Sequence, residues 1–71
     1  MKVTVNVFAL SVQVPNDGER VMVWNERRKE WATQVYNDHY KCWDDSEGDE
    51  YERDVNPDDI WFALPDNPKF L

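Results

Sequence analysis

Hydrophobic and polar residues alternate over much of the first part of the chain. Valine occupies every second position from residue 3 to residue 7, and from residue 8 to residue 14 the hydrophobic residues move to the even positions. A period of two is typical of a strand with one buried face. Because a shift of one residue exchanges the two faces of a strand, the change of parity predicts a bulge, a bend or two strands that meet near residues 7–9.

Four later segments have β-branched, aromatic or alternating residues that favour strands: 21–24, 31–36, 40–43 and 60–64. Residues 15–18, Pro-Asn-Asp-Gly, predict a tight turn, because proline suits the first central position of a turn and glycine allows a positive φ. Asn37 and Asp38 predict another turn. The connection at 25–30 is polar and lacks glycine, which predicts a loop of more than two residues.

These elements predict a mainly β protein with a small antiparallel sheet of about five strands, curled into an SH3-like open barrel. At 71 residues the chain has room for a single domain, residues 1–71, that buries roughly 60% of its unfolded surface. The expected helix content is at most one short turn at residues 56–59, where an asparagine cap precedes a proline and two acids.

The composition excludes several classes of protein. Hydrophobic residues make up 41% of the chain, and four Trp, three Tyr and three Phe are too many for a disordered sequence. The single cysteine, Cys42, cannot form an internal disulfide. The first residues contain no continuous apolar signal region, and no apolar run approaches the ~20 residues that span a bilayer. We therefore expect a soluble, cytoplasmic protein that does not act at a membrane.

The formal net charge of -7 is concentrated in one part of the chain. Nine of the 15 acidic residues, but only one of the 8 basic residues, lie in residues 44–59, the acidic segment, which therefore carries -8 and leaves +1 elsewhere. Direct binding to nucleic acid phosphates or to anionic lipid requires a basic face, which this charge disfavours. The charge instead predicts a partner with a basic surface.

Two motifs lie near the ends of the chain. The first comprises Ser11, Val14, Pro15, Gly18 and residues 21–24, and the second comprises residues 60–65 and Pro68. They resemble a family of short phage and prophage proteins, a domain of unknown function, whose members open W-I-x-V-S-E-R-L-P-x-x-G-x-x-V-L-V-Y and close near H-W-M-P-L-P-x-P-P. The resemblance covers about half of the chain and departs from the family at Val7, Val12 and Ala63, where the family has Trp, Glu and Pro. It implies a small β-rich domain and a phage or prophage origin, and it carries over no catalytic residue.

No arrangement of residues predicts catalysis. His39 and Cys42 form an H-x-x-C pair, but zinc needs four ligands and the chain has no second His or Cys. A calcium loop with Gly48 at its sixth position would place Trp43 at the first, where an acid is required. We expect a protein that is not an enzyme and has no metal site and no cofactor, although dense carboxylates leave an irregular divalent-cation site as a minor alternative.

The leading hypothesis is a small acidic accessory protein of phage type that binds a basic surface of a host protein, as an inhibitor that mimics nucleic acid. Carboxylates along an extended segment approach the spacing of phosphates along a DNA strand. The predicted partner-binding residues are the nine acids of the acidic segment, with two aromatic anchors between them: Asp44, Asp45, Glu47, Asp49, Glu50, Glu52, Asp54, Asp58 and Asp59, with Trp43 and Tyr51.

Three alternatives stay open from the sequence. The first is a protein that sequesters nucleotides or other small ligands by stacking them on Trp24, Trp31 and Trp61, with Arg27 or Arg28 on the phosphates. The second is a structural or assembly module that associates through its sheet edges. In the third, the acidic segment is a solvated loop that its own charge repulsion keeps extended.

Overall fold

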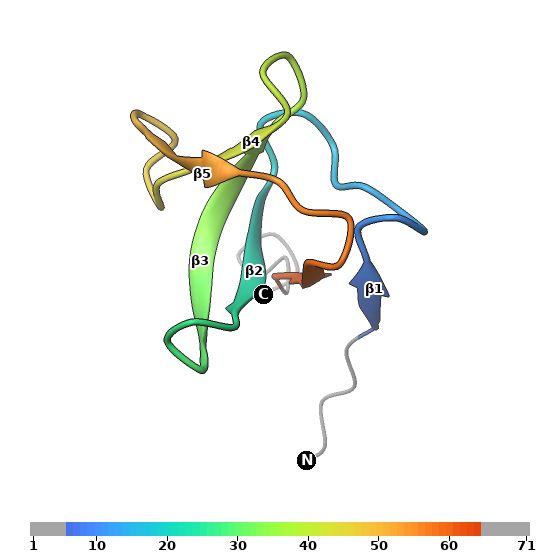
Figure 1. The fold of residues 1–71 in the computed structure, drawn as a ribbon. Helices are drawn as coiled ribbons and strands as arrows, with labels where there is room; N and C mark the ends of the chain where they lie inside the picture. Colours follow the sequence, from blue (N-terminus) through green and yellow to red (C-terminus); the bar gives the residue numbers. More distant parts are fainter. Residues whose placement is uncertain (1–5, 65–71) are drawn as a thin grey trace, which may run out of the picture.

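The two longest strands form a central hairpin in the computed structural model, which describes residues 6–64 (Figure 1). Strand β2, Arg20–Asn25, pairs with β3, Glu30–Asn37, from Arg20 opposite Val35 to Asn25 opposite Glu30. Both strands are rich in β-branched and aromatic residues, which favour the extended conformation. The sequence prediction of these two strands is therefore confirmed.

Four shorter strands complete one antiparallel sheet: β1 Val7–Ala9, β4 Cys42–Asp44, β5 Tyr51–Asp54 and β6 Ile60–Ala63. The strand order is β1-β6-β2-β3-β4-β5, so the last strand lies between the first and the second. Figure 1 shows β4 and β5 running at a large angle to β2 and β3, which gives the sheet its curl. Because β1 and β5 are both edges, the sheet is not closed, and residues 6–64 contain no helix.

The acidic segment is more regular than the sequence indicates. Its residues 51–54 form β5, a sixth strand where about five were expected. Residues 56–59 form a turn in which the Asp59 amide donates to the Asn56 carbonyl at 2.8 Å, and no helix forms there, which agrees with the expectation of at most one helical turn. The Asn56 side chain does accept the Asp58 amide at 2.8 Å, but this contact supports a turn and not a helix start.

Strand β1 ends earlier than its alternating pattern predicts. The amides of Val12 and Gln13 both donate to the Ala9 carbonyl, at 2.9 and 3.0 Å, and this turn replaces the strand expected as far as residue 14. Val12 is 79% exposed as a result, whereas Leu10 is buried. The Gln13 carbonyl then accepts the indole N–H of Trp61 at 2.8 Å, which fixes the turn against β6.

The core lies on the concave face of the curled sheet. Val21 and Val23 of β2 are completely buried there, together with Trp43 of β4. Trp61 of β6 lies opposite Val23, and Tyr36 of β3 lies opposite Trp43 with ring centroids 5.5 Å apart. Each aromatic side chain buries on the order of 150–250 Å², so these rings supply much of the burial available to so small a fold.

Two of the hairpin loops repeat one design, an asparagine followed four residues later by a lysine. In the β2–β3 loop, Asn25 Oδ1 accepts the Arg28 amide at 3.0 Å and Lys29 has a positive φ of 58°. In the β3–β4 loop, Asn37 Oδ1 accepts an amide three residues later, also at 3.0 Å, and Lys41 has a φ of 53°. Each lysine also pairs with the acid three residues before it. The prediction of a connection longer than two residues between β2 and β3 is confirmed.

Candidate functional site

The acidic hairpin, residues 42–54, consists of β4, β5 and the loop between them. Asp45 begins that loop, and its amide donates to the Glu50 carbonyl at 2.8 Å. Its carboxylate accepts the backbone amides of Glu47 and Asp49, at 3.1 and 2.9 Å. Gly48 has a φ of 78°, a conformation that favours glycine, and its amide donates to the Asp45 carbonyl at 2.9 Å. The loop is thus held by its own backbone, by one carboxylate and by Arg20 of β2, whose Nε donates to the Ser46 carbonyl at 2.8 Å.

Asp45 is held in its ionised form by these contacts. The hydrogen bond from the Asp49 amide, followed by that from the Glu47 amide, lowers the pKa of the Asp45 carboxyl below its ordinary value, although partial desolvation opposes this. A carboxylate that accepts backbone N–H groups is stabilised in its charged form. Asp45 is therefore part of the loop structure in addition to contributing charge.

Asp59 has a similar structural role at the other end of the acidic segment. Its side chain is 11% exposed and accepts three hydrogen bonds: from the indole N–H of Trp43 at 2.8 Å, from the Asn56 amide at 2.9 Å and from Arg53 at 3.2 Å. Its backbone carbonyl also accepts the amide of Leu10 at 2.8 Å. Asp59 therefore joins β4, β5 and the end of β1 across the open side of the sheet.

Asp44 is the third carboxylate that the fold uses. It is half-buried, and its oxygens accept the side-chain amide of Asn37 at 3.2 Å and the thiol of Cys42 at 3.4 Å. Burial, and next the hydrogen bond with Asp44, raise the pKa of the Cys42 thiol, so this cysteine is not activated for nucleophilic chemistry.

The six remaining acids of the acidic segment are exposed: Glu47, Asp49, Glu50, Glu52, Asp54 and Asp58. Within residues 6–64 none of the six takes part in an ion pair. The only base of the segment, Arg53, pairs with Asp59 and so does not neutralise them. The structure therefore divides the predicted site into three carboxylates that hold the fold and six that face solvent.

The two predicted aromatic anchors differ in position. Trp43 is fully buried, because it packs against Tyr36 and donates its indole N–H to Asp59, so it is not accessible for the role of aromatic anchor that the sequence predicts. Tyr51 is 63% exposed on β5, where its hydroxyl donates to Asp54 at 3.2 Å. Partial desolvation, and next this hydrogen bond, raise the Tyr51 pKa. Tyr51 is therefore accessible to a partner and Trp43 is not.

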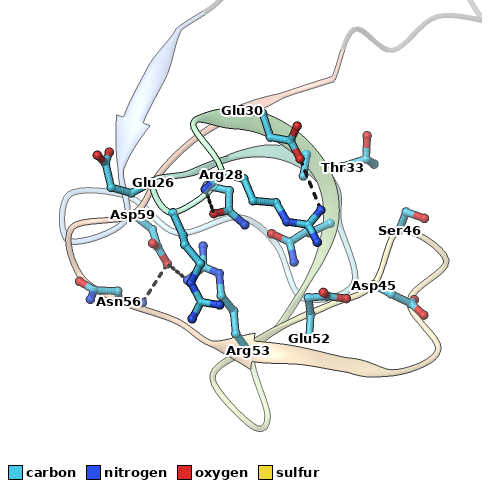
Figure 2. A pocket seen from close by; sticks show the side chains of 14 residues that line it. Glu26, Arg28, Glu30, Thr33, Asp45, Ser46, Glu52, Arg53, Asn56 and Asp59 are labelled. Carbon is cyan, nitrogen blue, oxygen red and sulfur yellow. Dashed lines mark hydrogen bonds and ion pairs between the residues drawn. The ribbon is translucent and has the colours of Figure 1, made fainter.

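A polar pocket of about 650 Å³ lies beside the acidic hairpin, within the curl of the sheet. Figure 2 shows Glu52 and Arg53 extending from β5 on one side of it, with Arg28 and Glu30 on the other. Arg28 approaches Glu30 at 3.6 Å across the mouth of the pocket. The β3 wall also includes Gln34, which is only 6% exposed. The acidic segment and the basic β2–β3 loop therefore face each other across one cavity.

The three tryptophans of the nucleotide-stacking alternative do not lie on one surface. Trp61 is buried in the core, whereas Trp24 and Trp31 lie on the opposite face of the sheet, with ring centroids 5.4 Å apart and Phe62 beside Trp31 at 4.9 Å. Among the described residues, those that line the polar pocket with Arg27 and Arg28 include no aromatic side chain. A stacking platform next to these arginines is thus not formed.

Within residues 6–64, no three His, Cys, Asp or Glu side chains are arranged so that they could hold a metal ion. The described residues also include no helix of the length and apolarity needed to cross a membrane. Comparisons with protein-family models, with curated proteins and with solved structures found no significant match. The resemblance to the phage and prophage family therefore stays a prediction.

Sequence reasoning missed two features of this site. The hydrogen bonds by which Asp59 joins β4 and β5 were missed, because nothing in the local sequence indicates which of the nine acids is buried. The polar pocket was missed because Gln34 belongs to the less hydrophobic face of β3, and the sequence alone does not show that this face is concave. The Asn-x-x-x-Lys pattern at 25–29 and 37–41 is the one signal in the sequence that could have predicted the loop design.

Proposed function

We propose that this protein acts by binding, with the acidic hairpin as the surface that engages a basic region of a partner protein. The observation that carries the proposal is the presence of six exposed carboxylates without ion-pair partners among residues 6–64, five of them on one ordered hairpin. Concentrated charge of one sign raises association rates with a complementary surface and suppresses unsuitable partners. In line with the phage resemblance, the proposed role is that of an accessory protein that inhibits a nucleic-acid-binding host protein.

The geometry of β5 supports a mimic of nucleic acid. Glu52 and Asp54 are two residues apart on β5, so ~3.3 Å per residue separates their backbones by roughly 7 Å. The pairing with β4 is irregular at Glu52, and the two side chains line different pockets. The phosphates of one DNA strand lie ~3.4 Å apart along the axis, so this backbone spacing corresponds to about every second phosphate. Because β5 pairs with β4 and its loop is hydrogen-bonded, little ordering is needed on binding.

The test compares two triple variants with the same change in charge. The hairpin variant is Glu47→Gln, Asp49→Asn and Glu50→Gln, and the control variant is Asp17→Asn, Glu19→Gln and Asp38→Asn. Each protein is used to capture partners from lysate between about 0.1 and 1 M salt, where the Debye length falls from ~10 to ~3 Å. We expect the hairpin variant, and not the control, to lose capture.

Two further results decide the outcome. A captured partner should elute as the salt rises, and duplex DNA should compete for it if the hairpin imitates a phosphate backbone. Equal capture by both triple variants would show that the charge of the hairpin is not the binding determinant. Capture that is indifferent to salt would equally contradict the proposal, because it would indicate an apolar interface.

The alternatives have less support. Nucleotide sequestration lacks a stacking ring in the polar pocket, as described above. An assembly module would use the edges β1 and β5 or the partly exposed Trp31, and concentration-dependent light scattering would detect it.

A further inference from the structure

The polar pocket contains a buried polar side chain without a partner. Gln34 is 6% exposed and lies in the pocket wall, yet its side-chain amide makes no hydrogen bond to any group of residues 6–64. A side-chain amide that makes no hydrogen bond within the protein has to be satisfied by solvent or by a ligand. No fully enclosed polar atom lacks a partner among the described residues, so the Gln34 amide must reach the pocket itself. It is available to a ligand.

The charges of the pocket show what kind of ligand would satisfy it. Three arginines line the pocket: Arg28 pairs with Glu30 at 3.6 Å and Arg53 with Asp59 at 3.2 Å, whereas Arg27 takes part in no ion pair within residues 6–64. Glu52 has no ion-pair partner within residues 6–64. The lining as a whole is negative, because it contains five acids against these three arginines: Glu26, Glu30, Asp45, Glu52 and Asp59.

We propose that the polar pocket binds one basic side chain, an arginine or a lysine of the partner protein, between the Gln34 amide oxygen and the Glu52 carboxylate. This inference rests on the proposed function, because the acidic hairpin would first attract the basic surface that presents the side chain. Guanidinium and ammonium groups have donors only, which matches an amide oxygen and a carboxylate. At about 650 Å³ the pocket is within the range of ligand sites, ~300–1,000 Å³.

An anionic ligand is less compatible with the same pocket. A phosphate could approach Arg27, but Arg28 and Arg53 are already paired with Glu30 and Asp59, and the phosphate would also meet Glu52. A nucleobase would find no aromatic ring to stack on among the described lining residues. The net negative charge of the lining residues and the lack of a stacking ring among them therefore both favour a cation as the ligand.

The first experiment is an NMR titration of the ¹⁵N-labelled protein with N-acetylarginine amide. We expect saturable shifts of the Gln34 side-chain amide and of the backbone amides of Glu52 and Arg53. The neutral isostere N-acetylcitrulline amide should bind about tenfold more weakly, because it lacks the charge that strengthens the hydrogen bonds. Shifts confined to loop residues 47–50, equal binding of the neutral isostere, or saturable shifts of Gln34 with inorganic phosphate would each overturn the inference.

Variants then distinguish specific binding of the arginine amide in the pocket from its general electrostatic attraction to the acidic hairpin. Glu52→Gln should weaken arginine amide binding about tenfold, whereas the matched change Glu47→Gln, in the hairpin loop outside the pocket, should weaken it less than about twofold. Gln34→Leu should abolish the saturable shifts, and its amide dispersion will show whether the fold is kept. Equal effects of Glu52→Gln and Glu47→Gln would overturn the inference without relying on the Gln34 variant.

The result also distinguishes this inference from the proposed function. The hairpin triple variant should lose partner capture but keep arginine amide binding within about twofold, because its three positions lie outside the pocket. Loss of capture without any saturable pocket binding would overturn the pocket inference alone. Pocket binding with undiminished capture by the triple variant would overturn the proposed function alone.

Discussion

Asp59 is the acidic residue whose removal we expect to affect the fold most. Asp59→Ala removes the acceptor of the Trp43 indole N–H and of the Asn56 amide, and each hydrogen bond to a charged group contributes about 1.5–3 kcal/mol. The Arg53 pair is partly exposed and adds at most about 1 kcal/mol. Because these contributions share one side chain and are not additive, we expect the free energy of unfolding to fall by about 3 kcal/mol.

This loss is large for a domain of 71 residues, whose total stability is on the order of 3.5–10 kcal/mol. It corresponds to a fall in Tm of roughly 12–24 °C. The assay is urea unfolding at neutral pH, followed by tryptophan fluorescence. The neighbouring exposed acid supplies the control: Asp58→Ala should change the stability by less than about 0.5 kcal/mol, because the Asp58 side chain accepts no hydrogen bond among the described residues.

A double-mutant cycle tests the physical cause. In a Trp43→Phe background the indole donor is absent, so Asp59→Ala should cost about 1–2 kcal/mol less than it does in the parent protein. Asp59→Asn keeps one oxygen acceptor and should lose about half as much as the alanine variant. A loss of unfolding free energy below about 1 kcal/mol for Asp59→Ala, or an equal loss in both backgrounds, would refute the proposed stabilising role of this carboxylate.

Three further predictions concern the same region. Gly48→Ala should lower the stability by about 1–2 kcal/mol, because Gly48 has a φ of 78°, a conformation that is unfavourable for a residue with a Cβ; an unchanged urea midpoint would contradict this. Cys42 is 3% exposed with a raised pKa, so a thiol reagent at neutral pH should label it slowly in the native protein and quickly in denaturant, and equal rates would contradict its burial. The pKa of Asp45 is lowered in the folded state, chiefly by the Asp49 amide, so the stability it provides is present above its ordinary value of 3.8 and is lost as the pH falls through the folded pKa. Asp45→Asn should flatten this part of an acid-unfolding profile, and an unaltered profile would argue against the loop contact.

The strands that the sequence predicts well are those whose hydrophobic pattern decides their burial. Strands β2 and β3 alternate or carry apolar runs, and β6 is a continuous run, Ile60–Ala63, as expected of a strand within a sheet. The insertion of β6 between β1 and β2 could not be predicted, because it joins segments about 40–55 residues apart in sequence and no local signal encodes that choice.

The hydrophobic pattern gives the wrong prediction at β5, an edge strand, and at the end of β1, where backbone hydrogen bonds determine the conformation. Strand β5 is Tyr-Glu-Arg-Asp, and only Arg53 is half-buried, so its composition indicates a loop although its backbone pairs with β4. At the end of β1 the hydrophobic pattern continues as far as Val14, but two amides donate to the Ala9 carbonyl and the chain turns. Strand propensity and hydrophobic periodicity predict neither the pairing of β5 with β4 nor the turn at the Ala9 carbonyl.

The candidate site shows the same limit, with a consequence for how it should be studied. Counting charges predicts where the acidic surface lies, but the nine acids divide into supporting and presented groups only through their contacts. Asp44, Asp45 and Asp59 accept hydrogen bonds that hold the hairpin and the open side of the sheet, so removing them changes stability together with charge. A uniform alanine scan of the acidic segment would therefore confuse unfolding with loss of binding. Neutralising only exposed positions, with the unfolding free energy measured for each variant, separates the two effects, because a binding defect at unchanged stability can arise only from the presented surface.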